Sequence, residues 1–130
     1  MEAHRNEFLS ISHEPEEGIV LLRWTEKTAG MTDENFKEAL ERFAGFAEQY
    51  GAKSLVVDVA KFRHSPSAEV GKWRDATIIP RYNKAGIRKF AFVTGKQGAA
   101  PPPGPPRAGE AFVTRFFGSE TEARRWLETV

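Results

Sequence analysis

Three residue types that could act together in hydrolysis lie close in the chain, at Asp58, His64 and Ser65. A carboxylate, an imidazole and a hydroxyl form the triad of serine hydrolases, in which the histidine takes the serine proton. Adjacent residues such as His64 and Ser65 usually point their side chains apart, and the sequence contains no Gly-x-Ser-x-Gly motif. A hydrolase is therefore the least favoured function, and we expect a non-enzymatic protein without catalytic residues.

The same segment can instead form a regulatory or partner-binding loop. A β-branched run ends at Asp58, and a polar turn with His64, Ser65 and Ser67 follows. Asp58 suits a strand end at which the carboxylate accepts hydrogen bonds from turn amides, and Ser67 after Pro66 suits a helix N-cap. A phosphate on Ser65 or Ser67 would be favoured by the positive end of the helix dipole. Structural caps and a phosphorylation switch are both open.

A second group of candidates lies on the helix predicted from residue 67 to about residue 82. Trp73, Ile78, Ile79 and Tyr82 belong to this segment, which Pro80 should break or kink. Aromatic residues at helical spacing are usually core, but Trp and Tyr are also frequent interface anchors. If this helix stands slightly off the sheet, these four side chains would line a pocket or a partner surface.

The periodicity of the remaining sequence predicts the elements that position these residues. Strands are expected at 8–11, 19–24, 55–59, 89–93 and 111–117, and helices at 32–50, 67–82 and 119–130. The run 55–59 does not alternate, so both of its faces should be covered, as in a parallel sheet. The order favours an α/β fold, in which three helices pack on a mixed sheet of about five strands, within a single domain at 7–130.

Composition excludes several functions. The 19 basic and 18 acidic residues of this 130-residue chain nearly cancel, so no positive field would attract nucleic acid. The absence of cysteine excludes disulfides and thiolate metal sites. His4, His13 and His64 are scattered, and no phosphate-binding loop motif occurs, so we expect neither a metal nor a cofactor. No apolar run is long enough for a membrane span, and we expect a cytoplasmic protein.

Residues 94–109 are rich in proline and glycine and should form an exposed loop. The spacing Pro102-x-x-Pro105-x-Arg107 matches polyproline ligands of aromatic-lined grooves. A plain loop or a lid over a neighbouring pocket are the alternatives.

Three segments carry a family resemblance: the strand at 55–59, the strand at 89–93 and the closing stretch at 116–127. Together they resemble the STAS superfamily, in particular its SpoIIAA-like (STAS/SEC14 domain) branch. The resemblance implies the SpoIIAA-like topology, and it implies a phosphorylated serine after the central strand. The family has an Asp-Ser-Ser-Gly motif there; this chain has His64-Ser65-Pro66-Ser67, which makes Ser65 the best positional match. The SEC14-like comparison implies an apolar pocket between sheet and helix.

Two functions therefore remain open. The first is a regulatory or protein-interaction domain of the STAS/SpoIIAA-like type, which would bind an unknown protein through the loop after Asp58 and the second helix. The alternative is a carrier or sensor of a small hydrophobic, lipid-like ligand. A homodimer is compatible with both.

Overall fold

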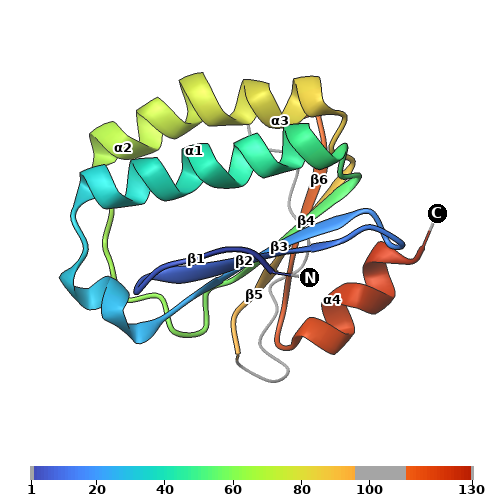
Figure 1. Cartoon of the computed structure of the whole chain (residues 1–130), viewed down its shortest axis with the longest axis horizontal. Coiled ribbons are helices and arrows are strands. Elements are labelled where there is room, and N and C mark those ends of the chain that lie inside the picture. The colour runs from blue at the N-terminus through green and yellow to red at the C-terminus, as the bar shows by residue number, and fades with distance from the viewer. Residues whose placement is uncertain (1, 96–110, 130) are drawn as a thin grey trace.

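The computed structural model describes residues 2–95 and 111–129, in which helices cover both faces of one mixed, six-stranded sheet (Figure 1). The strands are β1 (Glu2–Arg5), β2 (Leu9–Glu14), β3 (Ile19–Trp24), β4 (Ser54–Asp58), β5 (Lys89–Val93) and β6 (Val113–Phe117). The helices are the 3-10 helix η1 (Glu26–Gly30), α1 (Asp33–Tyr50), α2 (Ala68–Trp73), the π-helical turn η2 (Arg74–Ile78), α3 (Ile79–Ala85) and α4 (Glu120–Leu127). The expected α/β class is confirmed.

The strands follow one another across the sheet in chain order, antiparallel from β1 to β3 and parallel from β3 to β6. The expected number of about five strands is wrong, because β1 adds a sixth and extends the sheet to Glu2, ahead of residue 7. Its residues Glu2, His4 and Arg5 are polar, so the apolar alternation that indicates a strand is missing. An edge strand tolerates such residues because it buries little.

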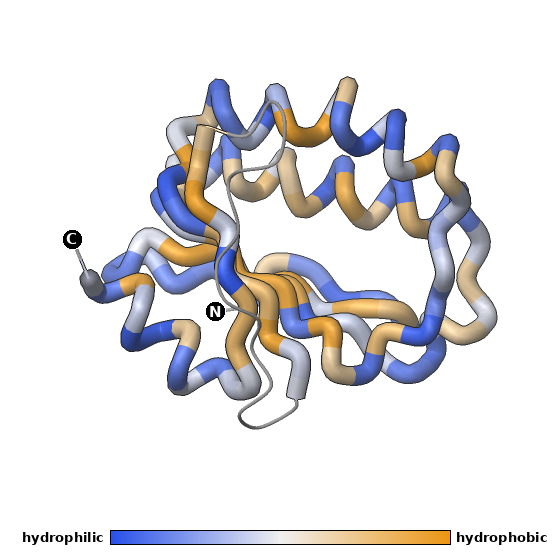
Figure 2. The backbone as a smooth tube through the Cα atoms, turned by 180° about the vertical axis from the view of Figure 1, so that it is seen from behind, coloured by the Kyte–Doolittle hydropathy of each residue, from blue (hydrophilic) through white to orange (hydrophobic). Residues whose placement is uncertain are grey.

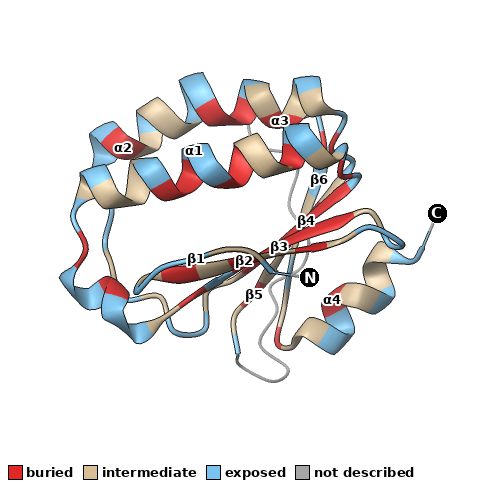
Figure 3. Cartoon of the chain, in the orientation of Figure 1, coloured by how far each residue is buried: buried red, intermediate tan, exposed pale blue. Residues whose placement is uncertain are grey.

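The helices divide the core into two layers. The larger cluster lies between the sheet and α1–α3 and includes Phe43, Leu55, Ile78 and Tyr82. The smaller cluster lies beneath α4 and is formed by Ile19, Leu21, Val56, Ala91, Val93 and Ala123. The apolar stretches of the central strands run between these helices, and buried positions line both faces of the sheet (Figures 2 and 3). The expectation that β4 is covered on both sides is confirmed.

The second helix is continuous through Pro80 rather than broken. Ser67 caps its start by accepting a hydrogen bond from the Val70 amide, at 3.3 Å, and the helix continues to Ala85. The π-helical turn η2 lies directly before Pro80, and the Ile79 amide donates to the Arg74 carbonyl. Proline lacks an amide proton and crowds the preceding turn, and a wider turn relieves this crowding.

Several expectations fall outside the described residues. The Pro/Gly-rich segment 94–109 lies outside the described residues except for Thr94 and Gly95. The Pro102–Arg107 motif and Val130 lie outside them as well, and so does the loop for which a lid was considered. Among the helices that the structure describes, none combines the length and apolar character needed to cross a membrane.

Candidate functional site

Two hollows lie at the end of the sheet where the parallel strands terminate, one on each face. Side chains alternate along each strand, so Arg23 and Asp58 face the α4 side while Trp24 and Val57 face α1–α3. Open α/β sheets usually bind ligands at the carboxyl ends of their strands. Both hollows are therefore candidate sites.

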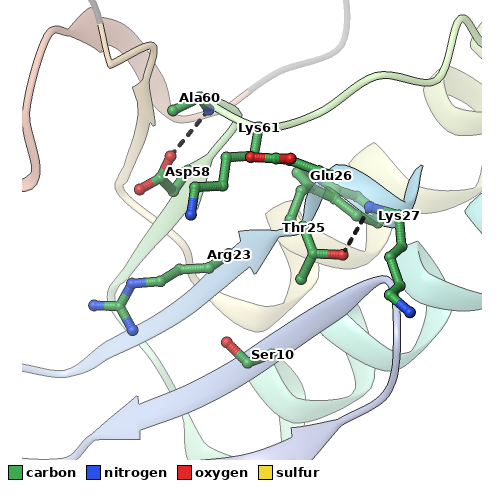
Figure 4. Close-up of a pocket in the computed structure, with 9 residues that line it drawn as sticks. Ser10, Arg23, Thr25, Glu26, Lys27, Asp58, Ala60 and Lys61 are labelled. Carbon is green, nitrogen blue, oxygen red and sulfur yellow. Dashed lines mark hydrogen bonds between the residues drawn. The ribbon is translucent and has the colours of Figure 1, made fainter. Parts of the chain in front are cut away.

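Most residues that line the hollow on the α4 side are polar or charged, and it is called the polar hollow below (Figure 4). Ser10, Arg23 and Asp58 are paired in register across β2, β3 and β4, so they form one row on this face. Lys27 and Lys61 lie at its rim, and the hollow has a volume of about 510 Å³. The Asp58 carboxylate accepts a hydrogen bond from the Ala60 amide, at 3.0 Å, which confirms its expected role at the strand end.

The guanidinium of Arg23 in the polar hollow already has a carboxylate partner. Arg23 donates two hydrogen bonds, of 2.7 and 2.8 Å, to the Glu120 carboxylate at the start of α4. This pairing lowers the pKa of Glu120, whereas burial, and then the neighbouring Glu120 carboxyl, raise the pKa of Asp58. The cluster attaches the first turn of α4 to the sheet, so we assign it a structural role.

His64 and Ser67 lie on the other side of the sheet and converge on a residue that the sequence analysis missed. The His64 Nε2 atom is 2.9 Å from the Asp33 carboxylate at the start of α1. Hydrogen bonds from Ser67 and then from His64 lower the pKa of Asp33. The N-cap interpretation of Ser67 is confirmed, and the Asp33 carboxylate joins the starts of α1 and α2.

The hydrolase triad is not assembled. His64 is bonded to Asp33 and not to Asp58, and Ser65 is exposed in the loop between β4 and α2. Asp58 faces the polar hollow on the opposite side of the sheet. The three residue types that are close in the sequence are therefore divided between the two faces.

The hollow on the α1–α3 side is an apolar cavity of about 140 Å³. It lies between the sheet on one side and α1 and the continuous helix α2–η2–α3 on the other. Its walls are formed by Trp24, Phe36, Leu40, Val57, Val59, Phe62, Arg74, Tyr82, Phe90 and Phe92. The rings of Trp24, Phe36 and Phe62 pack against one another with centroids 4.8–5.7 Å apart and form one end. The stacked rings of Phe90 and Phe92 form part of the sheet wall.

The loop that carries Phe62 is held in place by Thr28 of η1. Thr28 is fully buried; its hydroxyl donates to the Thr25 carbonyl and accepts from the Arg63 amide, both at 2.8 Å. The Phe62 amide itself donates to the Val59 carbonyl at 3.0 Å. These bonds position the aromatic end of the cavity.

The four residues expected to line a pocket lie in different environments. Tyr82 is buried and lines the cavity, whereas Ile78 and Ile79 are buried in the surrounding core. Trp73 is half-buried, with the Lys37 ammonium 5.5 Å from its ring centroid. The sequence analysis missed Arg74, which also lines the cavity.

A signal for Arg74 exists in the sequence. Val70, Arg74, Ile78 and Tyr82 follow one another at four-residue steps, and the three apolar members are buried. Residues at this spacing share one face of a helix. An arginine in such a row indicates a cation placed toward the core.

No family model matches the chain, and comparisons with curated proteins and with solved structures gave no match at the threshold applied. The resemblance to the STAS superfamily therefore stays a prediction. The function has to be inferred from the geometry of the site.

Three arginine–glutamate ion pairs predict that the stability of the fold decreases in acid. Hydrogen bonds from Arg124, Arg81 and Arg23 hold the pKa values of Glu14, Glu48 and Glu120, respectively, below their usual 4.5. Their stabilisation is present above pH 4.5 and is lost as the pH falls through the lowered values. Asp58 acts in the opposite direction, because its raised pKa favours the folded state at low pH.

Glu14→Gln tests this dependence. Urea unfolding at pH 6 should show a loss of about 0.5–1 kcal/mol, the range of a partly exposed ion pair. The difference from the wild type should shrink as the pH falls below 4.5 and through the lowered pKa of Glu14. Glu16→Gln, in the exposed turn nearby, controls for the loss of one charge. A Glu14→Gln deficit that does not decrease at all as the pH is lowered would rule out the ion pair as its cause.

Proposed function

We propose that the protein is a carrier or sensor that binds a small hydrophobic ligand in the cavity between the sheet and α1–α3. The observation that supports this most is the cavity itself, whose walls are almost entirely aromatic and aliphatic. Ligand pockets are typically apolar with few polar groups, and this one lies at the carboxyl end of parallel strands. An engineered cavity of about 150 Å³ in another protein holds benzene, so a single ring fits better than a long acyl chain.

A ligand in this cavity would stabilise the contact between the two layers. Trp24 and Val57 belong to the sheet, Leu40 to α1 and Tyr82 to α3, and a bound molecule would touch all three elements. A ligand that binds only the folded state raises its stability by about 2.7 kcal/mol at 100 times its Kd. Occupancy would thus change the rigidity of the helix layer, as a sensor requires.

A regulatory or protein-interaction domain of the STAS/SpoIIAA-like type is the second proposal. One observation favours it: Ser65 is exposed in the loop that also carries Phe62 and His64. A kinase or a partner protein could reach Ser65 there. A homodimer and a cytoplasmic location are compatible with both proposals, and neither proposal involves catalysis.

Toluene titrated into protein with labelled methyl groups tests the first proposal. We expect saturable shifts of the Leu40 and Val57 methyl signals, because both side chains line the cavity. Val59→Phe should fill the cavity and weaken toluene binding by about tenfold or more, since each lost contact costs affinity. Val113→Phe is the matched control, because Val113 is exposed on β6.

Two results would overturn the proposal. One is a wild-type protein whose methyl signals do not respond to toluene. The other is a Val59→Phe variant that folds normally and binds toluene as tightly as the Val113→Phe control.

A further inference from the structure

One hydroxyl group lies deep in the wall of the apolar cavity. Tyr82 lines this cavity and is only 1% exposed. Its ring packs among those of Phe43, Phe90 and Phe112, with centroids 5.6–6.3 Å apart. These contacts account for a buried aromatic ring, and a phenylalanine would make them equally well. The hydroxyl therefore requires an explanation of its own.

The Tyr82 hydroxyl forms no hydrogen bond with any residue that the structure describes. A buried tyrosine usually finds a partner for its hydroxyl, because an unmade hydrogen bond away from water is destabilising. Burial raises the pKa of the Tyr82 phenol, so the hydroxyl keeps its proton at neutral pH and remains a donor. The described part of the chain thus contains a buried donor without an acceptor.

The direction of the side chain places this donor on the cavity side of its helix. Helical side chains lean toward the N-terminus of their helix, so Tyr82 extends from α3 toward η2. The first residue of η2, Arg74, also lines the cavity. After burial, the charge of Arg74 has the next largest influence on the pKa of the phenol, which agrees with this direction. An acceptor inside the cavity is therefore within reach of the hydroxyl.

We propose that the ligand is a small, uncharged, single-ring compound with one hydrogen-bond acceptor, such as a carbonyl oxygen, that accepts from the Tyr82 hydroxyl. Its ring would fill the apolar part of the cavity. An uncharged acceptor suits this site because moving a charge into apolar surroundings is costly, whereas one hydrogen bond satisfies both neutral groups. The inference rests on the proposed function and adds the polarity of the ligand and the residue that recognises it.

The stability of Tyr82→Phe without ligand tests the premise. Removing a hydroxyl that has no partner should leave the midpoint of urea unfolding unchanged or raise it, because the variant no longer buries an unpaired donor. A clear fall in the midpoint would show that the hydroxyl already has a partner in the free protein, and it would overturn the inference.

Two probes of nearly the same shape test recognition of an acceptor. Benzonitrile carries an acceptor nitrogen at the end of its substituent, and phenylacetylene carries a C–H group in that place. Both are titrated by calorimetry into wild type and Tyr82→Phe. The variant should bind benzonitrile about tenfold more weakly, because the nitrogen is then buried without a donor, and should bind phenylacetylene as wild type does. The comparison between variants cancels the different hydration of the two probes.

The nitrile group also reports the hydrogen bond directly. The C≡N stretching band moves to higher frequency when the nitrogen accepts a hydrogen bond. Benzonitrile bound to wild type should show this shift, and benzonitrile bound to Tyr82→Phe should absorb as it does in an apolar solvent. Tyr50→Phe is the matched control: Tyr50 is the only other tyrosine, stacks on His13 and Phe46, and does not line the cavity. This control should change neither the affinities nor the band.

The outcomes separate the inference from the function on which it rests. If phenylacetylene and toluene bind but Tyr82→Phe lowers both affinities equally or neither, the inference fails and the apolar site stands. If no probe binds wild type, the proposed function fails and the inference fails with it. If Tyr82→Phe does not fold, the nitrile band in wild type decides, and a band at the position of an apolar solvent would overturn the inference.

Discussion

Thr28→Val is expected to lower the free energy of unfolding by about 1–3 kcal/mol, because it removes the hydroxyl that accepts from the Arg63 amide and leaves the Thr25 carbonyl with only its bond from the Thr28 amide. The Thr28 hydroxyl donates to the Thr25 carbonyl and accepts from the Arg63 amide, both at 2.8 Å. Valine has nearly the same shape as threonine but no hydroxyl. The Arg63 bond joins η1 to the loop after β4, so the effect should extend to the Phe62 end of the cavity.

The measurement is urea unfolding combined with amide hydrogen exchange. Thr28→Ser is the control: it keeps the hydroxyl and loses one methyl group, at a cost of about 1 kcal/mol. We expect Thr28→Val, unlike Thr28→Ser, to speed exchange at Arg63. Equal losses in the two variants would show that packing, and not the hydrogen bonds, makes Thr28 important.

Gly95→Ala is expected to cost about 2–4 kcal/mol through two effects, a strained backbone and a steric clash. Gly95 has a φ of +77°, which L side chains rarely adopt. A Cβ atom there would lie 2.6 Å from the Ala60 Cβ atom in the loop after β4, far inside van der Waals contact. Both loops emerge from the carboxyl end of the sheet.

The two effects can be separated by removing the obstructing atom. In an Ala60→Gly background the nearest remaining atom is the Ala60 Cα at 3.5 Å, an ordinary contact. Gly95→Ala should then cost only about 1 kcal/mol, from backbone strain. Gly71→Ala, inside α2 with open space around it, should instead stabilise by about 0.5–1 kcal/mol. An unchanged Gly95→Ala cost in both backgrounds would refute the clash.

The regular elements can be predicted from the sequence because their signals are local. Thr32 accepts a hydrogen bond from the Asn35 amide at the start of α1, and Gly51 ends that helix with a φ of +62°. The Ser119 cap of α4 is equally local, since its partner is the Glu122 amide. Each signal lies within a few residues of the element end that it marks.

The candidate site is less predictable because its contacts join distant parts of the chain. Asp33 binds His64, 31 residues away, and Thr28 binds the Arg63 amide, 35 residues away. A cavity exists only after two layers have packed and left a space, which no local pattern encodes. The four-residue spacing that places Arg74 on the buried face of its helix could have indicated this cavity residue. A search for amphipathic helices that follows only apolar residues misses a charged residue on that face.

The order of the strands has a consequence for how the chain assembles during synthesis. Every strand pairs with the one made just before it, so the sheet can grow at a single edge as the polypeptide lengthens. The antiparallel pairs β1–β2 and β2–β3 can form first, and each parallel strand can be added once its preceding connection is complete. No strand of this sheet has to insert between two strands that were synthesised before it. We therefore expect unpaired strand edges to be exposed only briefly while the chain is on the ribosome.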